Sequence, residues 1–492
     1  MLLGIYLRTL APGLTWLHHG SDGGDLIAAT ATGGIPHPTG YPLYLLLARV
    51  FQFLPVGSLA YRTNLMSAIF AMLASLLIYG IVVRHLPAGH GLLRGLAGMA
   101  AGFASGLAPL VWSQAVITEV YTLQAFLVAA IISVYSGSPS LLKARDGWRG
   151  LVLALALANH ITSLLLVPAA LVLGSVQRLG GEPASQEKRL PRLGHRYRFS
   201  VQALGWQLLW LLAGLSLYLV LPLRALAHPL INWGNPLTLD RLWWVVSGQY
   251  YQSVFFRLVT VHVWEQLAVW MKFSLMQMGA IAILVGLLNL ILLERLSRLV
   301  LLTIWAAATS LLFVYFYHPA DAEVYLLPLL ISCSIWLGLG TGRLAGGLSR
   351  YSPGLSVGFT ILVFGIVLLR PSFYFHQVDA SQNHEAERFG RQVLSSAPEN
   401  AILFARGDQA LFTLWYFHFA LGQRPDVAVL ATDLLPYDWY QENLRYAYPS
   451  LSLPGEMLFP ETIARANSNR PTCRVEYSNG RKVSCTPPLQ SP

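Results

Sequence analysis

The chain has 492 residues, of which 55% are hydrophobic and only 11% are charged, and its mean hydropathy is +0.52. This composition excludes an ordinary soluble domain and is typical of a polytopic membrane protein. The net charge of the chain is +10, and the whole basic excess lies within residues 1–370, which hold 23 Lys and Arg against 11 Asp and Glu. Residues 371–492 hold 10 Lys and Arg against 12 Asp and Glu. Membrane insertion and anionic lipid account for this basic excess, so no nucleic-acid partner is expected.

A helix that crosses a bilayer needs about 20 mostly apolar residues, and about eleven such stretches precede residue 371. They are predicted at 2–17, 63–83, 93–110, 120–135, 149–158 with 162–176 as a broken pair, 203–222, 273–293, 299–317, 324–342 and 355–370. The first stretch is interpreted as an uncleaved helix, because it carries Arg8 and lacks a small-residue cleavage site. The sequence therefore predicts an all-α transmembrane bundle over residues 1–370.

The distribution of charge between the loops predicts the orientation of this bundle. Fifteen basic residues lie in alternate loops: Arg84, Arg94, Lys143, Arg145, Arg149, Arg178, Lys188, Arg189, Arg192, Arg196, Arg198, Arg295, Arg298, Arg343 and Arg350. The positive-inside rule makes those loops cytoplasmic. The opposite loops hold most of the acids, at Asp22, Asp25, Glu119, Asp240, Glu265, Asp321 and Glu323. This assignment requires Asn159-His160 to break the segment 149–176 into two short helices, and it predicts a multi-pass protein of the cell (inner) membrane.

The last 120 or so residues have a different pattern. Hydrophobicity falls after Arg370-Pro371, and the segments 401–405, 411–421 and 426–430 read as strand, helix and strand. A small α/β domain over residues 371–492 is therefore expected, on the extracytoplasmic side. Cys473 and Cys485 flank a predicted Asn-Gly hairpin turn and are expected to form a disulfide, although a regular two-residue hairpin would place them one position out of line.

The first outer loop contains the strongest candidates for chemistry. Asp22 and Asp25 are three residues apart among glycines and can point into one cavity at the membrane surface. The alternative is that either carboxylate caps a helix. His37 and Tyr41 follow in a stretch that three prolines keep extended, which is also compatible with a merely stiff loop.

Further candidates lie in later outer segments. Glu119 is the only acid in a long apolar tract, where an ionisable group is costly unless it functions or is paired. His160 lies at the predicted helix break, and a structural role is equally compatible with that place. Arg224 at an outer helix end can bind phosphate or extend to lipid headgroups. Asn232 and Trp233 follow it, and no zinc-type spacing, phosphate-binding loop or serine nucleophile elbow is present.

Several ordered motifs together resemble a known family. They are Asp22-Gly-Gly-Asp25, Pro36-His-Pro-Thr-Gly-Tyr-Pro42, Trp112-Ser-Gln with Glu119-Val-Tyr-Thr-Leu, Asn159-His160, and Leu221-Pro-Leu-Arg224 with Asn232-Trp-Gly234. The family is a bacterial membrane family, formerly a domain of unknown function, that is related to a eukaryotic transmembrane protein O-mannosyltransferase and belongs to the C-type glycosyltransferase superfamily. The resemblance covers residues 1–370, with a similar tail. The chain departs from the family at Asp25, where Glu is frequent, and at Thr39, where a second Pro is frequent.

The resemblance implies an inverting glycosyltransferase that uses a polyprenyl-phosphate sugar donor and a hydroxyl of a protein or glycan acceptor outside the membrane. It implies that a first-loop acid is the general base, with Asp22 and Asp25 as the catalytic residues and Asp22 as the first choice. The expected substrate-binding residues are His37, Tyr41, Glu119, His160, Arg224, Asn232 and Trp233. No cofactor is expected, and a divalent cation is not expected to be required.

A transporter or lipid-linked sugar flippase is the alternative function, because broken helices and buried ionisable groups also form transport sites. The two halves of the chain show no internal similarity of the kind many transporters have. A scaffold that displays the outer domain is a third reading, but it leaves the clustered acids without a role.

Overall fold

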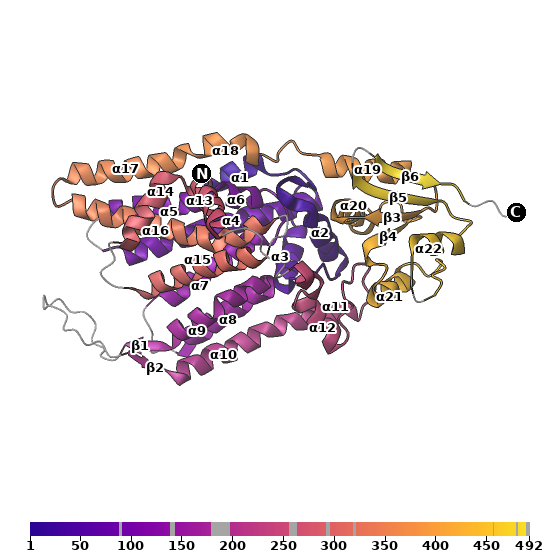
Figure 1. The fold of residues 1–492 in the computed structure, drawn as a ribbon, viewed down its shortest axis with the longest axis horizontal. Coiled ribbons are helices and arrows are strands. Elements are labelled where there is room, and N and C mark those ends of the chain that lie inside the picture. Colours follow the sequence, from indigo (N-terminus) through magenta and orange to yellow (C-terminus); the bar gives the residue numbers. More distant parts are fainter. Residues whose placement is uncertain are drawn as a thin grey trace.

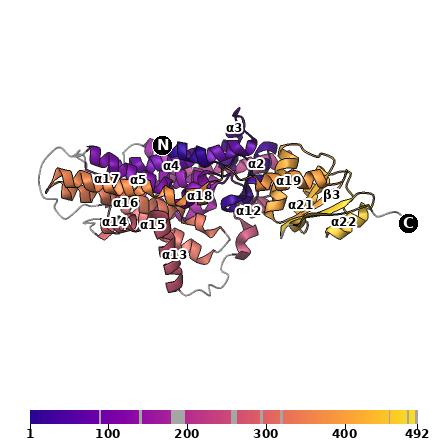
Figure 2. The same ribbon diagram turned by 90° about the horizontal axis from the view of Figure 1, so that it is seen from above.

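The computed structural model of the chain describes residues 1–87, 91–137, 143–178, 197–254, 263–291, 296–317, 321–455, 457–478 and 481–488. Helices form a long bundle on the left of Figure 1, and a small domain built on a four-stranded sheet lies at the right end. Figure 2 shows the same division from above. The N-terminus lies within the bundle, and the last strand, β6, lies in the small domain.

The bundle and its loops contain, in chain order and with η for short helices other than α, α1 (Leu2–Thr9), η1 (Leu17–Asp22), α2 (Gly23–Thr32), α3 (Pro42–Gln52), α4 (Leu59–His85), α5 (Gly91–Gly106), α6 (Pro109–Ala115), α7 (Tyr121–Ser136), α8 (Lys143–Asn159), η2 (Ile161–Leu165), α9 (Val167–Ser175), α10 (Val201–Leu215), η3 (Ser216–Leu219), α11 (Val220–Ala225), α12 (Leu239–Val246), η4 (Gln249–Val254), α13 (Val263–Met278), α14 (Ala280–Ile291), α15 (Arg298–Phe316), η5 (Ala322–Leu326), α16 (Leu327–Leu348), α17 (Pro353–Leu369) and α18 (Pro371–Val378). Strands β1 (Val176–Arg178) and β2 (Tyr197–Phe199) form a short antiparallel pair between α9 and α10.

The expected class, a helical membrane bundle with a small α/β domain, is confirmed. Within the described residues, five helices are long and apolar enough to span a bilayer, and two bent pairs raise this number to at most seven. The predicted number of about eleven is higher because it counted shorter apolar segments as spans. Helices α7 and α8, for example, have only 16 and 17 residues.

The first predicted span, residues 2–17, is wrong in its extent. Helix α1 ends at Thr9, and the chain becomes extended at Leu10. The reason is Pro12, since a proline disfavours helical geometry in the residue before it and removes a donor. The carboxamide of Asn64 donates to the carbonyls of Ala11 and Gly13, which satisfies this irregular backbone inside the bundle.

The predicted break at Asn159-His160 is confirmed. Helix α8 ends at Asn159, η2 follows, and α9 runs back beside α8 (Figure 1). Arg149 near the start of α8 donates from Nη1 to the carbonyl of Gly174 near the end of α9, at 3.2 Å, so the two helices are antiparallel. The loop that joins β1 to β2, residues 179–196, holds much of the predicted cytoplasmic charge and lies outside the described residues.

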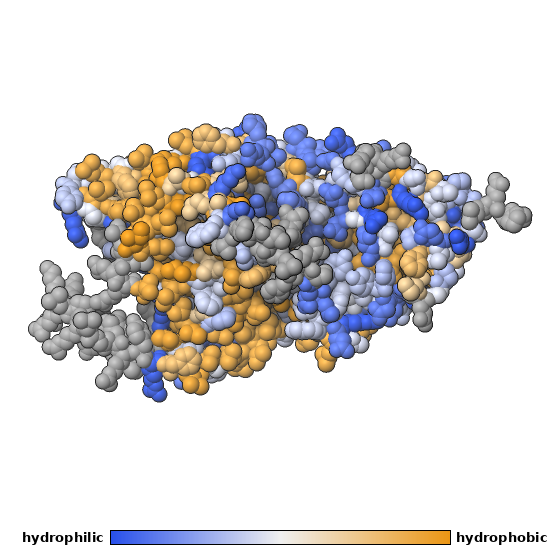
Figure 3. Space-filling model, in the orientation of Figure 1, coloured by the Kyte–Doolittle hydropathy of each residue, from blue (hydrophilic) through white to orange (hydrophobic). Residues whose placement is uncertain are grey.

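The surface of the bundle differs from that of the small domain. Figure 3 shows apolar side chains over much of the bundle and mostly polar ones over the small domain. Large exposed apolar side chains of the bundle include Leu212, Leu284, Leu355 and Leu362. A hydrocarbon environment is the natural solvent for such a surface, as expected for a multi-pass membrane protein.

The small domain contains α19 (Glu385–Ser396), β3 (Ile402–Arg406), α20 (Asp408–Trp415), η6 (Tyr416–Ala420), β4 (Ala428–Ala431), η7 (Thr432–Leu434), α21 (Asp438–Ala447), α22 (Pro460–Ala466), β5 (Thr472–Ser478) and β6 (Arg481–Thr486). The sheet order is β4-β3-β5-β6, with β3 parallel to both β4 and β5. The predicted strand, helix and strand correspond to β3, α20 with η6, and β4. The domain boundary that the sequence predicts, at residue 370, falls inside the continuous helical span Pro353–Val378. The first helix of the small domain is α19.

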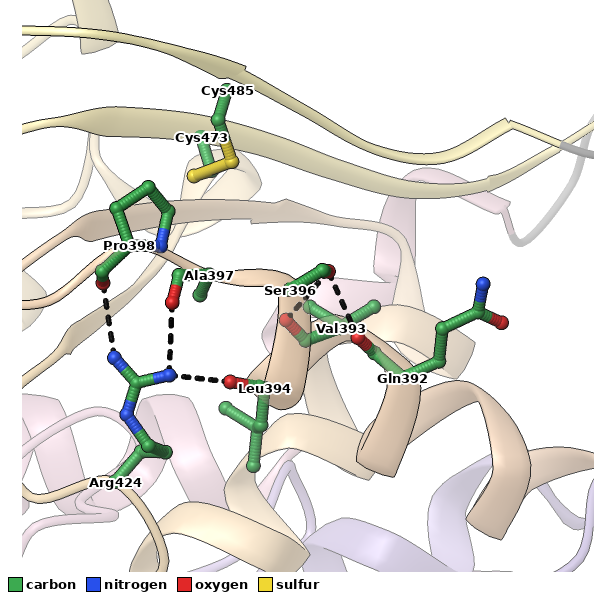
Figure 4. The surroundings of a disulfide bond; sticks show 9 residues. All are labelled: Gln392, Val393, Leu394, Ser396, Ala397, Pro398, Arg424, Cys473 and Cys485. Atoms are coloured by element: carbon green, nitrogen blue, oxygen red, sulfur yellow. Dashed lines mark hydrogen bonds between the residues drawn. A yellow bond between two sulfur atoms is a disulfide. The ribbon is translucent and has the colours of Figure 1, made fainter.

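The disulfide between Cys473 and Cys485 is confirmed, with the two Sγ atoms 2.06 Å apart (Figure 4). Ser478 pairs with Arg481, as a two-residue turn requires, but Cys473 pairs with Cys485. A β-bulge between Val475 and Ser478 shifts the register by one residue and so brings the cysteines opposite each other. In the same view, Arg424 donates to the carbonyls of Leu394, Ala397 and Pro398, which satisfies the C-terminal end of α19.

We expect Cys473 and Cys485 to be oxidised in protein isolated from its native compartment. The two residues face each other in the β5–β6 ladder, and an oxidising compartment keeps such a pair bonded. Mass spectrometry of peptides with and without reduction measures this, and Cys333, which is not bonded, serves as the free-thiol control. Finding the Cys473 and Cys485 thiols both free would contradict the expectation.

Candidate active site

A cavity of about 1130 Å³ lies where the bundle meets the small domain. Its walls come from η1, the loop around His37, the start of α7, η2, the ends of α12 and α15, η5, the β3–α20 turn and the end of β5. Elements far apart in the sequence therefore meet at this one site. The cavity brings together four of the predicted site residues, namely Asp22, His37, Tyr41 and His160.

Asp22 and Asp25 lie at the start of α2 but have different surroundings. The side chain of Asp22 is 31% exposed and lines the cavity, whereas that of Asp25 is fully buried behind His37. One oxygen of Asp25, Oδ2, accepts hydrogen bonds from the backbone N–H of His37 at 2.8 Å and from its Nδ1 at 2.7 Å. His37 Nε2 lies 3.4 Å from Asp22 Oδ2. The imidazole thus links a buried carboxylate to one that faces the cavity.

The electrostatic environment gives these groups unusual titration behaviour. Burial raises the pKa of Asp22 to about 6, although the nearby charge of His37 acts in the opposite direction. Burial alone would lower the pKa of His37, but the charges of Asp22 and Asp25 and the hydrogen bond to Asp25 raise it to about 9. Near neutral pH, His37 is therefore protonated and Asp22 is ionised but more basic than an ordinary aspartate.

Aromatic side chains surround this acid and histidine pair. The hydroxyl of Tyr41 donates to the carbonyl of Pro38 and lies 3.2 Å from His37 Nε2. His160 packs against Tyr41, Tyr121 and Tyr325 with ring centroids 5.8 to 5.9 Å apart. These rings make the inner end of the cavity a rigid surface of the kind that binds sugar rings or planar groups.

Some predicted site residues lie behind the walls rather than on them. Glu119 is only 3% exposed and does not border the cavity. Arg224 donates from Nη1 to the carbonyl of Gly34 at 2.9 Å and also lies outside the lining. Asn232 forms a backbone bridge with Ile35, and Trp233 packs edge-on to His37 with centroids 6.4 Å apart. Arg224, Asn232 and Trp233 therefore support the loop that carries His37.

The lining also contains polar residues that sequence reasoning did not place in the site: His18, His19, Tyr251, Asp321, Arg406, Asp408, Gln409 and Glu476. Asp321 accepts a hydrogen bond from the hydroxyl of Tyr121 at 3.0 Å. The position of Arg406 and Asp408, directly after a predicted buried strand, is a signal that could have found them, because ligands bind where parallel strands end. Nothing in the local sequence marks His18 and His19.

The loop that carries Asp22 has an unusual backbone. His18 and His19 both have left-handed conformations, with φ of 57° and 64°. Side chains other than glycine rarely adopt this region, and surrounding contacts must hold them in it. The side chain of Gln114 donates to the carbonyl of His18, and His18 Nε2 lies 3.0 Å from the carbonyl of Val378. The packing of the bundle thus fixes the backbone that leads into Asp22.

The small domain holds the Asp22 loop from the other side. Trp16 Nε1 donates to Thr413 of α20 at 3.0 Å, and Phe412 stacks on His37 with centroids 6.2 Å apart. A side chain on Gly24 would place its Cβ 2.3 Å from the carbonyl oxygen of Phe412, so α2 and α20 touch through backbone. A second contact between the bundle and the small domain is an ion pair in which Arg241 of α12 donates two hydrogen bonds to the carboxylate of Glu442 on α21.

Gly24→Ala is expected to destabilise the junction by about 1–3 kcal/mol, since the added methyl collides with backbone that cannot move locally. The measurement is the thermal unfolding midpoint in detergent, together with protease sensitivity of the small domain. Gly4→Ala in α1 is the matched control, because no atom lies within 4 Å of the added Cβ. An unfolding midpoint for Gly24→Ala equal to that of Gly4→Ala would contradict the tight contact.

Among the described residues, no three His, Cys, Asp or Glu side chains are arranged to hold a metal ion. The carboxylates and histidines of the cavity instead contact each other, tyrosines and backbone groups. The chemistry that this chain's own side chains offer in the cavity is proton transfer at Asp22 and hydrogen bonding by His37 and the tyrosines.

Comparison with known proteins identifies the relatives of this chain. Residues 22–179 match the N-terminal domain family of the protein O-mannosyl-transferase TMEM260, and residues 386–480 match a second TMEM260-associated domain. This chain is a relative of the TMEM260 protein O-mannosyltransferases. The mouse TMEM260 protein is 25% identical over 90% of the chain, and that of Dictyostelium discoideum is 23% identical over 93%. The chain spans about three fifths of the length of these TMEM260 proteins, 63% and 59%.

The fold also matches two solved structures. The structure of ArnT from Cupriavidus metallidurans bound to undecaprenyl phosphate superposes with a TM-score of 0.60 and 12% identity, covering 100% of this chain and 98% of ArnT. The apo structure of ArnT superposes with a TM-score of 0.53 and 13% identity, covering 96% of this chain and 91% of ArnT. The arrangement of bundle and small domain is therefore the ArnT fold. Both TMEM260 matches include parts of the cavity, since Asp22 begins the first and Arg406 and Asp408 lie in the second.

Proposed function

We propose that this protein is a membrane glycosyltransferase that moves a sugar from a polyprenyl-phosphate donor to a hydroxyl of a protein or glycan acceptor. The observation that supports this most is Asp22, a carboxylate of raised pKa that borders a cavity between a membrane bundle and a polar domain. The names of the TMEM260 relatives favour mannose as the sugar. The proposed location is the cell (inner) membrane.

Asp22 is the proposed general base. The acceptor hydroxyl gives its proton to the Asp22 carboxylate while the oxygen attacks the anomeric carbon of the donor. The bond from that carbon to the lipid phosphate breaks, and the phosphate leaves with the electron pair. Direct attack from the opposite side inverts the anomeric configuration. A base contributes most when its pKa is near the working pH, which favours Asp22 at about 6 over an unperturbed aspartate.

Asp25 and His37 are proposed to position this base. The two hydrogen bonds from His37 to Asp25 fix the orientation of the imidazole, and the protonated ring holds Asp22 through Nε2. Asp25 itself is buried and does not reach the cavity. Its role in this scheme resembles that of a buried carboxylate that orients a histidine in other enzymes.

One wall of the cavity suits a lipid donor. Ile161, Leu164 and Leu165 of η2 and Phe313 of α15 line it with apolar side chains, and both elements belong to the membrane bundle. Leu164 is 56% exposed, so this wall continues onto the apolar outer surface. A polyprenyl chain can therefore remain in the hydrocarbon layer while its sugar phosphate enters the cavity.

The cavity is proposed to open on the extracytoplasmic face. The cavity lies where the bundle meets the small domain, and the start of α15 and the turn between α16 and α17 lie at the other end of the bundle (Figure 1). The positive-inside rule assigns those two segments to the cytoplasm.

Cysteine labelling in intact cells tests this orientation. In a Cys333→Ser background, Ser395→Cys of α19 is expected to react with an impermeant thiol reagent, because the small domain lies outside. Tyr351→Cys, at an 87% exposed position, is expected to react only after lysis. Labelling of Tyr351→Cys before lysis with protection of Ser395→Cys would reverse the assignment.

The decisive assay for the function uses purified protein in lipid nanodiscs with a panel of labelled polyprenyl-phosphate sugars. Polyprenyl-phosphate mannose is expected to be converted to polyprenyl phosphate, and turnover is expected to survive chelation by EDTA. In sealed vesicles, the alternative flippase function predicts donor that crosses the membrane chemically intact. Translocation of intact donor without any cleavage would refute the transferase function.

A further inference from the structure

We propose that an anionic phospholipid of the surrounding membrane binds this protein beside α3, with its phosphate on Arg49 and Arg224 and its acyl chains against the α3 tip. The α3 tip is defined here as the exposed apolar side chains of Val50, Phe53 and Leu54, at and just after the end of α3. This lipid is a component of the bilayer and not the donor, so the inference goes beyond the proposed function.

The α3 tip is an apolar surface that the rest of the protein does not cover. Helix α3 projects from the body of the molecule close to the place where the bundle meets the small domain (Figure 2). The side chains of Val50 and Phe53 are 63% and 74% exposed. Arg62 of α4 donates hydrogen bonds to the carbonyls of Gln52 and Val56, so the turn after α3 is fixed in place. The exposed apolar tip is therefore a built feature, which is unfavourable in water and favourable in a bilayer interface.

Two guanidiniums meet beside the tip, at the C-terminal end of α2. Arg49 donates from Nη1 to the carbonyl of Ala31 at 3.1 Å. Arg224 donates from Nη1 to the carbonyl of Gly34 at 2.9 Å. The two positive charges are close enough to repel each other, and among the described residues neither arginine forms an ion pair with a carboxylate. An anion beside both guanidiniums would therefore be stabilised by both charges.

Both guanidiniums keep donors for such an anion. Arginine has five N–H donors in a planar fork, and the described residues take one from Arg49 and one from Arg224. The guanidinium of Arg49 also lies over the ring of Phe53, 5.0 Å from its centroid, so the charge and the apolar tip are adjacent. A phospholipid presents a phosphate and acyl chains side by side, whereas a soluble anion matches only the charge.

The position of Arg224 matches the depth of a lipid headgroup. Residues Val201–Ala225 are long and apolar enough to span a bilayer, and Arg224 lies at the end of this segment. Its neighbours Leu223 and Leu226 are exposed. A basic side chain at such a boundary reaches the headgroups and attracts anionic lipid. Arg224 also lies outside the lining of the Asp22 cavity, so its phosphate ligand is distinct from a donor bound in that cavity.

The test measures which lipids contact the α3 tip in a bilayer. In a Cys333→Ser background, Val50→Cys carries a bimane fluorophore, and the protein is placed in nanodiscs of phosphatidylcholine and phosphatidylglycerol. One lipid at a time has brominated chains, which quench a fluorophore that they touch. Brominated phosphatidylglycerol is expected to quench with an apparent affinity about fivefold higher than that of brominated phosphatidylcholine. Arg49→Ala and Arg224→Ala are each expected to lower this preference to about twofold or less.

Two controls accompany the measurement. The same fluorophore at Ser395→Cys, in α19 of the small domain, is expected to remain unquenched by either lipid. Arg388→Ala removes one positive charge at an exposed position of the small domain and should keep the parental preference. Because the Arg49 side chain is exposed, Arg49→Ala is expected to fold even if Arg224→Ala does not.

Three results would overturn the proposal. A fluorophore at Val50→Cys that neither lipid quenches would mean that something else, such as a second copy of the chain, covers the tip. Equal affinity for the two lipids in the parent, or an undiminished preference in Arg49→Ala, would remove the phosphate assignment. Displacement of brominated phosphatidylglycerol by polyprenyl phosphate would assign the two arginines to the donor instead.

Discussion

Replacing Asp22 with Asn is expected to lower turnover by about two to four orders of magnitude, with normal expression and membrane insertion. Asn keeps the shape of the side chain and caps a helix about as well as Asp, but it cannot accept the proton of the acceptor. Because the Asp22 side chain lies at the cavity wall and no hydrogen bond from it caps α2, the fold should tolerate the change. The rate of donor cleavage in nanodiscs measures the effect.

The control for this variant is Asp240→Asn, which changes an exposed acid outside the cavity and should retain parental turnover. An Asp22→Asn protein with parental turnover would remove the base assignment. Failure of Asp22→Asn to accumulate in the membrane would show that the carboxylate is needed for folding.

Asp25→Asn is expected to change the pH dependence of the turnover rate as well as the maximal rate. In the parent, activity should rise with pH as Asp22 ionises near 6, and it should fall as His37 loses its proton near 9. Asp25 helps to raise the pKa of His37, so removing its charge lowers that pKa and moves the alkaline limb toward neutral pH. If that pKa falls by roughly one unit, turnover of Asp25→Asn near pH 8.5 should be about fourfold lower than at neutral pH, whereas the parent should lose little activity over the same range.

The measurement is a pH–rate profile of donor cleavage for parent and Asp25→Asn in the same lipid. A uniform loss of activity at every pH, with both limbs in the parental positions, would mean that Asp25 acts only through structure. A profile identical to that of the parent would remove Asp25 from the site.

The membrane bundle could be predicted from sequence to a large degree, because long apolar stretches and alternating loop charge are strong signals. The break at Asn159-His160 was predicted from charge alone, and α8 and α9 show it. The end of α1 at Thr9 differs from the predicted span, because the apolar stretch continues past Pro12 whereas the helix does not. A regular two-residue hairpin would leave Cys473 and Cys485 one position out of line. The bulge between Val475 and Ser478 aligns them, and this bulge has no clear signal in the sequence.

Sequence reasoning found the part of the site that local motifs encode. Asp22, His37, Tyr41 and His160 do meet in one cavity. It could not separate the positions of Asp22 and Asp25, since only the folded loop decides which carboxylate faces the cavity and which lies beneath His37. Arg406 and Asp408 carry a sequence signal, since they follow a predicted strand, but only the docking of the small domain on α2 and α12 brings them and Glu476 to the cavity of Asp22.

A cryo-EM structure of Asp22→Asn protein in nanodiscs with bound polyprenyl-phosphate mannose tests the proposed role of Asp22 most directly. We expect the sugar to lie in the cavity with its anomeric carbon facing residue 22, and the lipid chain to leave along Leu164 and Phe313. A donor bound elsewhere on the bundle, or one whose sugar lies at the cavity with its anomeric carbon turned away from residue 22, would contradict it.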